Sequence, residues 1–201
     1  TAPNAGHRAL AALERNGAVT GVITQNVDRL HTAAGSRQVI DLHGHYNEVV
    51  CLTCGHILTR SELDARLLDL NPGFLERVTE LGDVEIAPDA DAVIEQTSQF
   101  RIASCEQCGG TLKPNIVYFG ENVPKERVAR AYAMVEDADA LLAVGTSLAV
   151  QSGLRLVKRA HRDGKPIVII NRGSTRGDEF ATLRLNAGSS QALEFLAARL
   201  P

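Results

Sequence analysis

The sequence predicts an α/β fold in which helices cover both faces of a parallel sheet and a small second module is inserted into the chain. Short, continuously apolar runs at 140–144 and 167–170 are separated by segments that carry apolar residues at helical spacing. Such strands, alternating with helices, are typical of a parallel sheet that is buried on both faces. Residues 55–104 hold ten acidic and four basic residues, whereas the remainder of the chain holds fourteen and seventeen. A middle segment of different charge indicates a separate module.

Composition limits the classes of protein and of partner. The 201 residues are 44% hydrophobic, which is enough for one core and a small satellite module. The apolar runs fall far short of the roughly 18 residues that suggest a membrane span. No signal peptide is recognisable in the first residues, so we expect a soluble protein. A formal net charge of −3 gives no reason to expect nucleic acid as a direct partner.

The first third of the chain predicts two helices and one strand. Asn4 can cap a helix that ends near Asn16. The run 19–24 is apolar and β-branched, which predicts a buried strand. We expect a short helix over 27–34, and the segment 39–42 is a further, short apolar run.

Polar side chains gather where the run 19–24 ends. Gln25, Asn26 and Asp28 follow it directly, and His43 comes after the next short apolar segment. Carboxamide, carboxylate and imidazole groups at the end of a buried strand suggest a functional site. A lone histidine is more often structural than catalytic. Only the motif around His43 favours a functional role for it.

The four cysteines form two pairs, Cys51 with Cys54 and Cys105 with Cys108. Four thiolates at this spacing suit a tetrahedral Zn²⁺ ion, and a glycine after each pair lets the chain turn around the sulfurs. Two disulfides or a redox dithiol are the alternatives, and the former is disfavoured without a secretion signal. His56 is a further candidate ligand, although four thiolates already complete the shell.

Residues 55–104 read as an insertion in the cysteine module. Residues 61–70 predict a helix that Asn71, Pro72 and Gly73 stop, and 82–91 predict a surface loop. The acidic stretch is either a solvated face or an element that reaches towards the functional site.

After the second cysteine pair, residues 116–119 predict a strand, and Gly120 permits another backbone to approach closely. This strand is either part of the core or a docking edge for an extended peptide.

The last third of the chain alternates regularly between helix and strand. A helix from about Pro124 carries its apolar residues at i, i+3, i+4 and i+7, and a strand follows over 140–144. A helix to about Arg162, a strand over 167–170 and a final helix near Leu200 complete the pattern.

Three polar clusters follow three of the predicted strands, at residues 25–28, 145–147 and 171–173. Ligands of open parallel sheets bind outside the carboxyl ends of the strands. We expect residues 145–147 to lie at a helix start, where glycine, hydroxyls and amides accept a phosphate. A single Gly-Thr-Ser is more often a cap, but three clusters at equivalent ends predict a nucleotide site.

These motifs, taken in order, resemble the sirtuins. The resemblance rests on residues 24–28, Leu42-His43-Gly44, the paired cysteines, Lys113-Pro114 with residues 119–121, Gly145-Thr146-Ser147 and Ile170-Asn171. Residues 30–36 and 171–178 look most like the class II, mitochondrial-type branch of that family.

The resemblance implies an NAD-dependent protein-lysine deacylase that releases nicotinamide and O-acyl-ADP-ribose. His43 would be the catalytic base, which takes a proton from a ribose hydroxyl of NAD after the acyl oxygen has displaced nicotinamide. Gln25 would lie at the nicotinamide-side ribose, and Asn26 and Asp28 in the nicotinamide pocket. The cosubstrate would also be bound by Gly145, Thr146, Ser147, Asn171, Arg172 and, at the adenine edge, Ser189.

The resemblance also implies the organisation and partners of the protein. A Rossmann-like NAD-binding domain would comprise residues 1–47 and 113–201, and a structural zinc module residues 48–112. An acyl-lysine peptide would pair with Val117, Tyr118, Phe119, Gly120 and Glu121. We expect a monomer in the cytoplasm, and a mitochondrial matrix location fits the same sequence.

The glycine-rich phosphate loop and the Asp-Phe-Arg loop with which the family begins are not among these 201 residues. We therefore expect these residues alone to bind NAD poorly and to have little activity. A protein mono-ADP-ribosyltransferase and a noncatalytic zinc-stabilised binding domain remain the alternatives.

Overall fold

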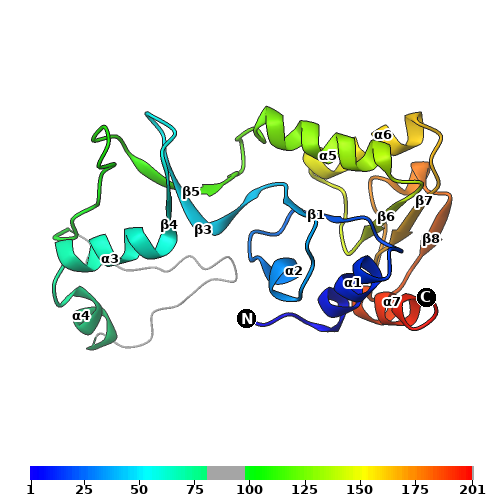
Figure 1. The fold of residues 1–201 in the computed structure, drawn as a ribbon, viewed down its shortest axis with the longest axis horizontal. Helices are drawn as coiled ribbons and strands as arrows, with labels where there is room; N and C mark the ends of the chain where they lie inside the picture. Colours follow the sequence, from blue (N-terminus) through cyan, green and yellow to red (C-terminus); the bar gives the residue numbers. More distant parts are fainter. Residues whose placement is uncertain (81–97, 201) are drawn as a thin grey trace. The chain divides into compact units, whose positions relative to one another are not determined.

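The computed structural model describes residues 1–80 and 98–200, which form two units (Figure 1). One unit comprises Thr1–His45 and Ile116–Pro201, and the other comprises Tyr46–Asn115. The loop predicted at 82–91 lies outside the described residues. In the described part of the chain, no helix has the length and apolar character needed to cross a membrane.

The first unit consists of short parallel strands and the helices that cover them. Its elements are α1 (Ala5–Arg15), β1 (Val22–Thr24), α2 (Leu30–Ala33), β2 (Val39–Asp41), α5 (Lys125–Asp137), β6 (Leu141–Val144), α6 (Gln151–Arg162), β7 (Ile167–Ile170), the 3₁₀ turn η1 (Asp178–Phe180), β8 (Leu183–Leu185) and α7 (Ser189–Ala197). β1 pairs with β2, and β7 lies between β6 and β8; all these pairs are parallel. The predicted α/β fold is confirmed.

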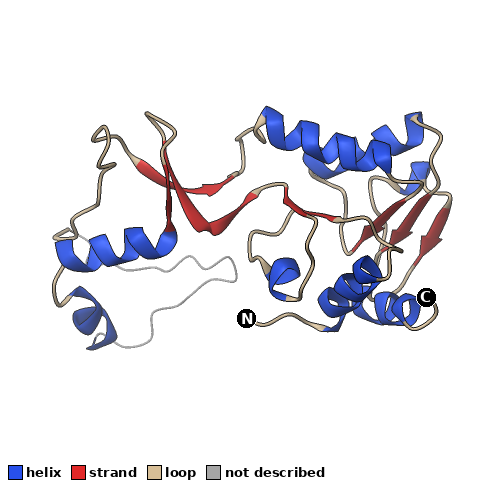
Figure 2. Cartoon of the chain, in the orientation of Figure 1, coloured by secondary structure: helices blue, strands red, loops and turns tan. Residues whose placement is uncertain are grey.

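Helices lie on both sides of the sheet formed by β6, β7 and β8. Figure 2 shows α5 and α6 on one side and α1 and α7 on the other. The core lies under α5 and α6, where β7 contributes Ile167 and Ile169 and β2 contributes Ile40. Because the core reaches from β2 to β7, it fixes the ends of strands that are far apart in the sequence.

The second unit contains a three-stranded sheet and two helices. Its elements are β3 (Gly44–Cys51), β4 (Ile57–Thr59), α3 (Arg60–Leu70), α4 (Phe74–Glu80) and β5 (Leu112–Ile116). The strand order is β4-β3-β5, and β3 and β4 form an antiparallel hairpin around the first cysteine pair. Thr59 caps α3 and Glu62 completes a capping box, which is why this helix begins just before the predicted one.

Two predicted elements in the first third of the chain are shorter in the structure. The strand predicted from 19 begins only at Val22, whose amide donates to the carbonyl of Gln38 over 2.8 Å. The helix predicted over 27–34 begins at Leu30. Asp28 Oδ1 accepts the Leu30 amide, and Arg29 adopts a left-handed conformation with φ of 62°, so the chain turns there before the helix can form.

The strand predicted over 116–119 is wrong. β5 ends at Ile116, and the next residues form a turn, in which the Tyr118 amide donates to the Glu121 carboxylate and the Glu121 amide donates to the Tyr118 carbonyl. Both hydrogen bonds measure 3.0 Å. Strand propensity of residues 117–119 is therefore overridden by a local turn that Glu121 closes.

Candidate active site

His43 lies in the turn between β2 and β3 and is held through both ring nitrogens. Nδ1 is 3.1 Å from the Gln25 carbonyl oxygen, and Nε2 is 2.8 Å from Ser152 Oγ. A carbonyl only accepts, so Nδ1 carries the proton of the neutral ring. Nε2 then offers its lone pair, to which the Ser152 hydroxyl donates. The ring is thus set in the tautomer whose basic atom is Nε2.

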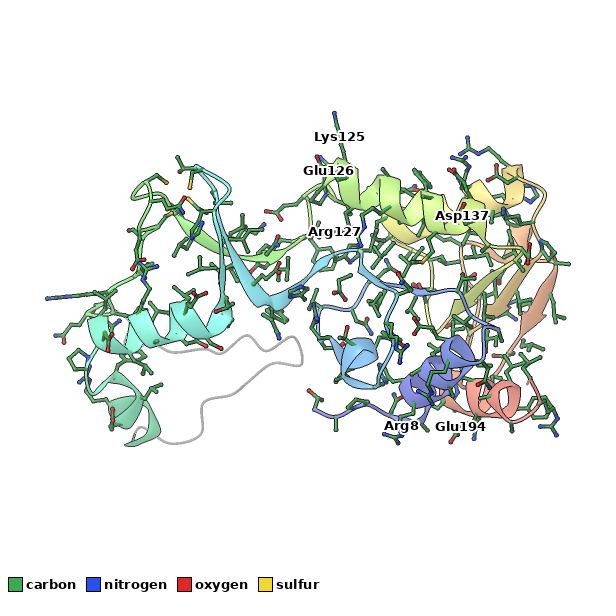
Figure 3. The ribbon with its side chains drawn as sticks, viewed as in Figure 1. Arg8, Lys125, Glu126, Arg127, Asp137 and Glu194 are labelled. Carbon is green, nitrogen blue, oxygen red and sulfur yellow. The ribbon has the colours of Figure 1, made fainter. Side chains whose placement is uncertain are left out.

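The environment favours the neutral imidazole. Partial burial lowers the pKa of His43 below its usual value, the Gln25 carbonyl opposes this shift, and the positive charge of Arg127 adds to it. Arg127 lies on the first turn of α5 (Figure 3). Its guanidinium donates to the Leu42 carbonyl over 3.5 Å. A neutral histidine is the form that accepts a proton, so His43 has the protonation state of a general base.

Gln25 connects the end of β1 with the end of β6. Its Oε1 atom accepts a hydrogen bond from Thr146 Oγ1 at 3.2 Å. Gly153, on the first turn of α6, leaves the space that this carboxamide fills, because a Cβ there would lie 3.0 Å from Gln25 Oε1. The Gln25 side chain, which is predicted to contact the ribose, is therefore held by residues of both the β6 loop and α6.

The other polar residues after β1 shape the turn that leads to α2. The Asn26 amide donates to Thr24 Oγ1 over 3.1 Å, and the buried Thr24 side chain thereby anchors the turn. Asp28 uses one carboxylate oxygen for the Leu30 amide at 3.0 Å. Arg29 pairs with Asp41 at 3.5 Å, which links this turn to the end of β2.

Residues 145–147 lie at the end of β6, but they do not begin a helix as predicted, because α6 starts at Gln151. Thr146 Oγ1 accepts the Leu148 amide at 3.1 Å, and Ser147 Oγ accepts the Ala149 amide at 3.4 Å. Each hydroxyl therefore accepts the backbone amide two residues further along and stabilises the loop between β6 and α6. Gly145 has φ of 62°, and a Cβ on it would lie 2.7 Å from Ser189 Oγ, so glycine is required here for close packing of α7.

A surface pocket of about 500 Å³ lies at the ends of β7 and β8. It brings together three predicted cosubstrate residues, Asn171, Arg172 and Ser189, with its other lining residues being Asn4, Ala187, Gly188, Ser190 and Gln191. A guanidinium among amide and hydroxyl groups suits a ligand with anionic and polar parts. The donors of this pocket, together with Gln25 and Thr146, fit the chemistry of NAD.

The segment predicted to bind peptide is exposed. Phe119 is fully exposed and Tyr118 is 47% exposed. The Val117 amide donates to the His43 carbonyl over 2.8 Å, so this segment is joined directly to the backbone of the histidine.

The four cysteines come together in the second unit. Their sulfur atoms lie within 4.8 Å of one another. The Sγ atoms of Cys51 and Cys108 are 3.5 Å apart and those of Cys54 and Cys105 are 3.8 Å apart, both longer than the roughly 2 Å of a disulfide. The four thiols are thus free and arranged around one point, as in a tetrahedral zinc site.

The backbone around the cysteines supports ion binding. Gly55 and Gly109 both have positive φ, and their amides donate to the carbonyls of Cys51 and Cys105 over 3.0 and 2.7 Å. The amides of Cys54 and Thr53 lower the pKa of the Cys51 thiol to about 6, whereas contacts with the neighbouring thiols raise the pKa of Cys108. Cys51 therefore readily gives the thiolate that a metal needs.

His56 takes no part in this group of thiols; its carbonyl accepts the Cys51 amide over 2.8 Å. Four thiolates leave no open position, so an ion held by them has a structural role.

Sequence reasoning did not find the first turn of α6. Ser152 lies 109 residues after His43, and no local pattern marks it as a partner. The same holds for Gly153, which reads as an ordinary glycine within a helix. Both become visible only when the fold places the start of α6 next to the residues that follow β1 and β2.

Comparison with known proteins identifies close relatives. The Sir2 family model matches residues 1–152. The chain is 57% identical over 200 residues to NAD-dependent protein deacetylase 1 of Mycobacterium avium (strain 104), covering all of this chain and 71% of that protein. It is 49% identical to NAD-dependent protein deacetylase 1 of Streptomyces coelicolor, covering 98% of this chain and 65% of the relative. The chain thus spans about two thirds of the length of its curated relatives.

Solved structures agree with this assignment. A complex of a Sir2 homolog with NAD has a TM-score of 0.75 and 30% identity, covering 99% of this chain and 65% of that one. A Sir2 complex with a p53 peptide and NAD⁺ has a TM-score of 0.73 and 31% identity, covering 98% and 70%. The chain therefore belongs to the Sir2 family, the sirtuins.

Proposed function

We propose that this protein is an NAD-dependent protein-lysine deacylase, which releases nicotinamide and O-acyl-ADP-ribose. The observation that carries the proposal is the setting of His43, whose Nε2 lone pair is oriented by the Gln25 carbonyl and the Ser152 hydroxyl. Relatives that are 57% and 49% identical are named NAD-dependent protein deacetylases. A zinc ion held by the four cysteines would be structural.

His43 acts as the general base. Bound NAD supplies the ribose carbon from which nicotinamide leaves. Nε2 of His43 takes the proton of a ribose hydroxyl, and Nδ1 keeps its own proton on the Gln25 carbonyl. Because burial lowers the pKa of the ring, the neutral base prevails at neutral pH.

The remaining polar residues bind and orient the cosubstrate. Gln25, which accepts a hydrogen bond from Thr146, would contact the nicotinamide-side ribose, and Asn26 and Asp28 would form the nicotinamide pocket. The hydroxyls of Thr146 and Ser147 and the backbone at Gly145 would face the phosphates from the loop after β6, and the pocket with Asn171, Arg172 and Ser189 would take the adenosine end. The Ser189 hydroxyl, which lies over Gly145, would then stand between these two parts of the cosubstrate. The support for these assignments is the resemblance of the motifs to those of the family, together with the location of most of these residues after β1, β6 and β7.

The protein substrate is an acylated lysine within an extended peptide. Related solved structures contain a Sir2 protein with an acetylated peptide and Sir2Tm with a propionylated peptide. The peptide lies along Val117–Glu121, where the exposed Tyr118 and Phe119 offer contact area next to the His43 backbone. We propose a class II enzyme that works as a cytoplasmic monomer, without direct contact with nucleic acid.

The test is nicotinamide release by the longest natural form of the protein on acetylated, propionylated and longer-chain acyl peptides. His43→Ala should abolish release, and the control His161→Ala, a change at an exposed residue of α6, should leave it unchanged. Equal rates for His43→Ala and the unaltered protein would refute the assignment of the base. Label from NAD that stays on protein would indicate ADP-ribosyl transfer, and no release from any peptide would indicate a binding domain.

A further inference from the structure

The first turn of α6 contacts both residues on which the proposed chemistry depends. Ser152 is 6% exposed, and its Oγ atom lies 2.8 Å from His43 Nε2. Its neighbour Gly153 leaves the space for the Gln25 carboxamide. The same turn therefore packs against the His43 imidazole and against the side chain of Gln25. The backbone carbonyl of Gln25 is the group that accepts from His43 Nδ1.

We propose that Ser152 is a positioning residue for His43, which holds the ring with its Nε2 lone pair in a single direction before the reaction. The proposal rests on the deacylase function given above, but the hydrogen bond itself can be tested without NAD. Ser152 acts through His43 and is assigned no bond to substrate.

Two fixed points are needed to define the orientation of an imidazole. The Gln25 carbonyl fixes Nδ1, but this single bond leaves the ring free to tilt about the line from Nδ1 to the carbonyl oxygen. Ser152 supplies the second point at the opposite nitrogen. The accepting Gln25 carbonyl follows β1, and the donating Ser152 hydroxyl lies at the start of α6. The ring therefore bridges these two elements.

Serine suits this role because its hydroxyl both donates and accepts. It donates to the lone pair of neutral Nε2, and after a rotation of the hydroxyl it accepts from Nε2–H of the protonated ring. When the ribose hydroxyl of NAD arrives, the serine can rotate about χ1 and leave the Nε2 lone pair to that hydroxyl. The base is therefore held at rest without being blocked.

The alternative is that Ser152 is an ordinary buried serine that His43 happens to satisfy. Ser36 offers the matched comparison, because it is 4% exposed and its Oγ has no hydrogen-bond partner among the described residues. The described part of the chain thus contains a buried serine hydroxyl without a hydrogen-bond partner. Burial alone does not account for the contact between Ser152 and His43.

The direct test is nitrogen NMR of the protein without NAD, with ¹⁵N in its six histidines. The His43 signals are identified by their loss in His43→Ala. Above the pKa of the ring, Ser152→Ala should shift the Nε2 resonance towards that of an unbonded nitrogen, while Nδ1 stays protonated on the Gln25 carbonyl. Ser152→Thr should keep the position seen in the unaltered protein, and Ser36→Ala should leave both nitrogens unchanged.

An Nε2 resonance at the same position in Ser152→Ala and in the unaltered protein would overturn the proposal, provided that both show the same amide spectrum. If the extra methyl of Ser152→Thr disturbs the fold, Ser152→Cys keeps a weak donor and should give an intermediate shift. Since no cosubstrate is present, this outcome is separate from whether the protein is a deacylase.

Kinetics on the longest natural form gives the second readout. Loss of one hydrogen bond should lower kcat of Ser152→Ala roughly two- to tenfold with little change in the KM for NAD. Ser152→Thr keeps the hydroxyl and should restore most of the rate. A serine that only fills space in the core would not make the rate depend on the hydroxyl. A kcat equal to or above that of the unaltered protein would contradict positioning, even if release of nicotinamide confirms the function.

Discussion

Thr146 donates a hydrogen bond to Gln25 across 121 residues of sequence, with 3.2 Å between Oγ1 and Oε1. This contact joins the polar residues after β1 to the loop after β6. It also fixes the carboxamide that we assign to the ribose, at the same oxygen against which Gly153 packs. The two halves of the predicted nucleotide site are thus connected through side chains as well as through the shared core.

Removal of the Thr146 hydroxyl should weaken NAD binding without changing the base. In Thr146→Val the carboxamide of Gln25 loses one hydrogen bond, and we expect a KM for NAD that is about two- to tenfold higher. Thr146→Ser keeps the hydroxyl and is the matched control, with a KM close to that of the unaltered protein. A Thr146→Val enzyme with unchanged KM would show that Gln25 is held by other contacts.

Gly153→Ala should separate stability from cosubstrate binding. Alanine favours a helix by about 1 kcal/mol over glycine, so the thermal midpoint should stay level or rise. The added Cβ lies 3.0 Å from Gln25 Oε1, and the carboxamide must move. We expect a severalfold higher KM for NAD.

The control for Gly153→Ala is the double variant with Gln25→Ala. Once the carboxamide is absent, Gly153→Ala should add nothing, because its effect acts through Gln25. Additive effects of the two changes would mean that Gly153 influences binding by a different route.

The sequence was sufficient to predict the elements whose signals are local. The α1 helix has its cap in Asn4, and the cysteine pairs carry their own turn glycines, so both are apparent in a few consecutive residues. β8 escaped prediction because Leu183–Leu185 is short and exposed, and its assignment depends on pairing with β7. Likewise, the turn at Tyr118 depends on the Glu121 carboxylate, which overrides strand propensity.

The candidate site shows the same division. Gln25, His43 and Asn171 stand in motifs at strand ends, where residue type and position suffice for a prediction. Ser152 has no such motif, because its partner comes from the end of β2 and only the packing of α6 brings the two together. Gly145 was predicted as a point of ligand approach, whereas the structure places the Ser189 hydroxyl in the space above it.

Stability should fall as the pH decreases from about 7 to 5. Burial lowers the pKa of His31, His7 lowers it further, and Asp28 and Asp41 act in the opposite direction. A folded-state pKa below the unfolded value means that the unfolded chain binds more protons through this pH range. The free energy of unfolding therefore decreases as the pH falls through the ordinary histidine range.

The measurement for this pH effect is urea unfolding at intervals between pH 5 and 8. His31→Gln cannot take up the proton, so its free energy of unfolding should depend less steeply on pH than that of the unaltered protein. Identical slopes would show that His31 titrates alike in both states. His43 has a lowered pKa for the same first reason, burial, and contributes to the slope that remains.

Zinc removal should unfold the unit Tyr46–Asn115, because the four thiols join the β3–β4 hairpin to the chain before β5. The protein as isolated should contain one zinc ion per chain, and Cys105→Ser should contain less. A strong chelator should lower the thermal midpoint and remove helical circular dichroism, since metal binding and folding are coupled at such sites. Added Zn²⁺ should restore both signals.

A chelated, metal-free protein with an unchanged thermal midpoint would contradict a structural role of the ion. Loss of catalysis while the fold persists would indicate that the ion acts in the reaction.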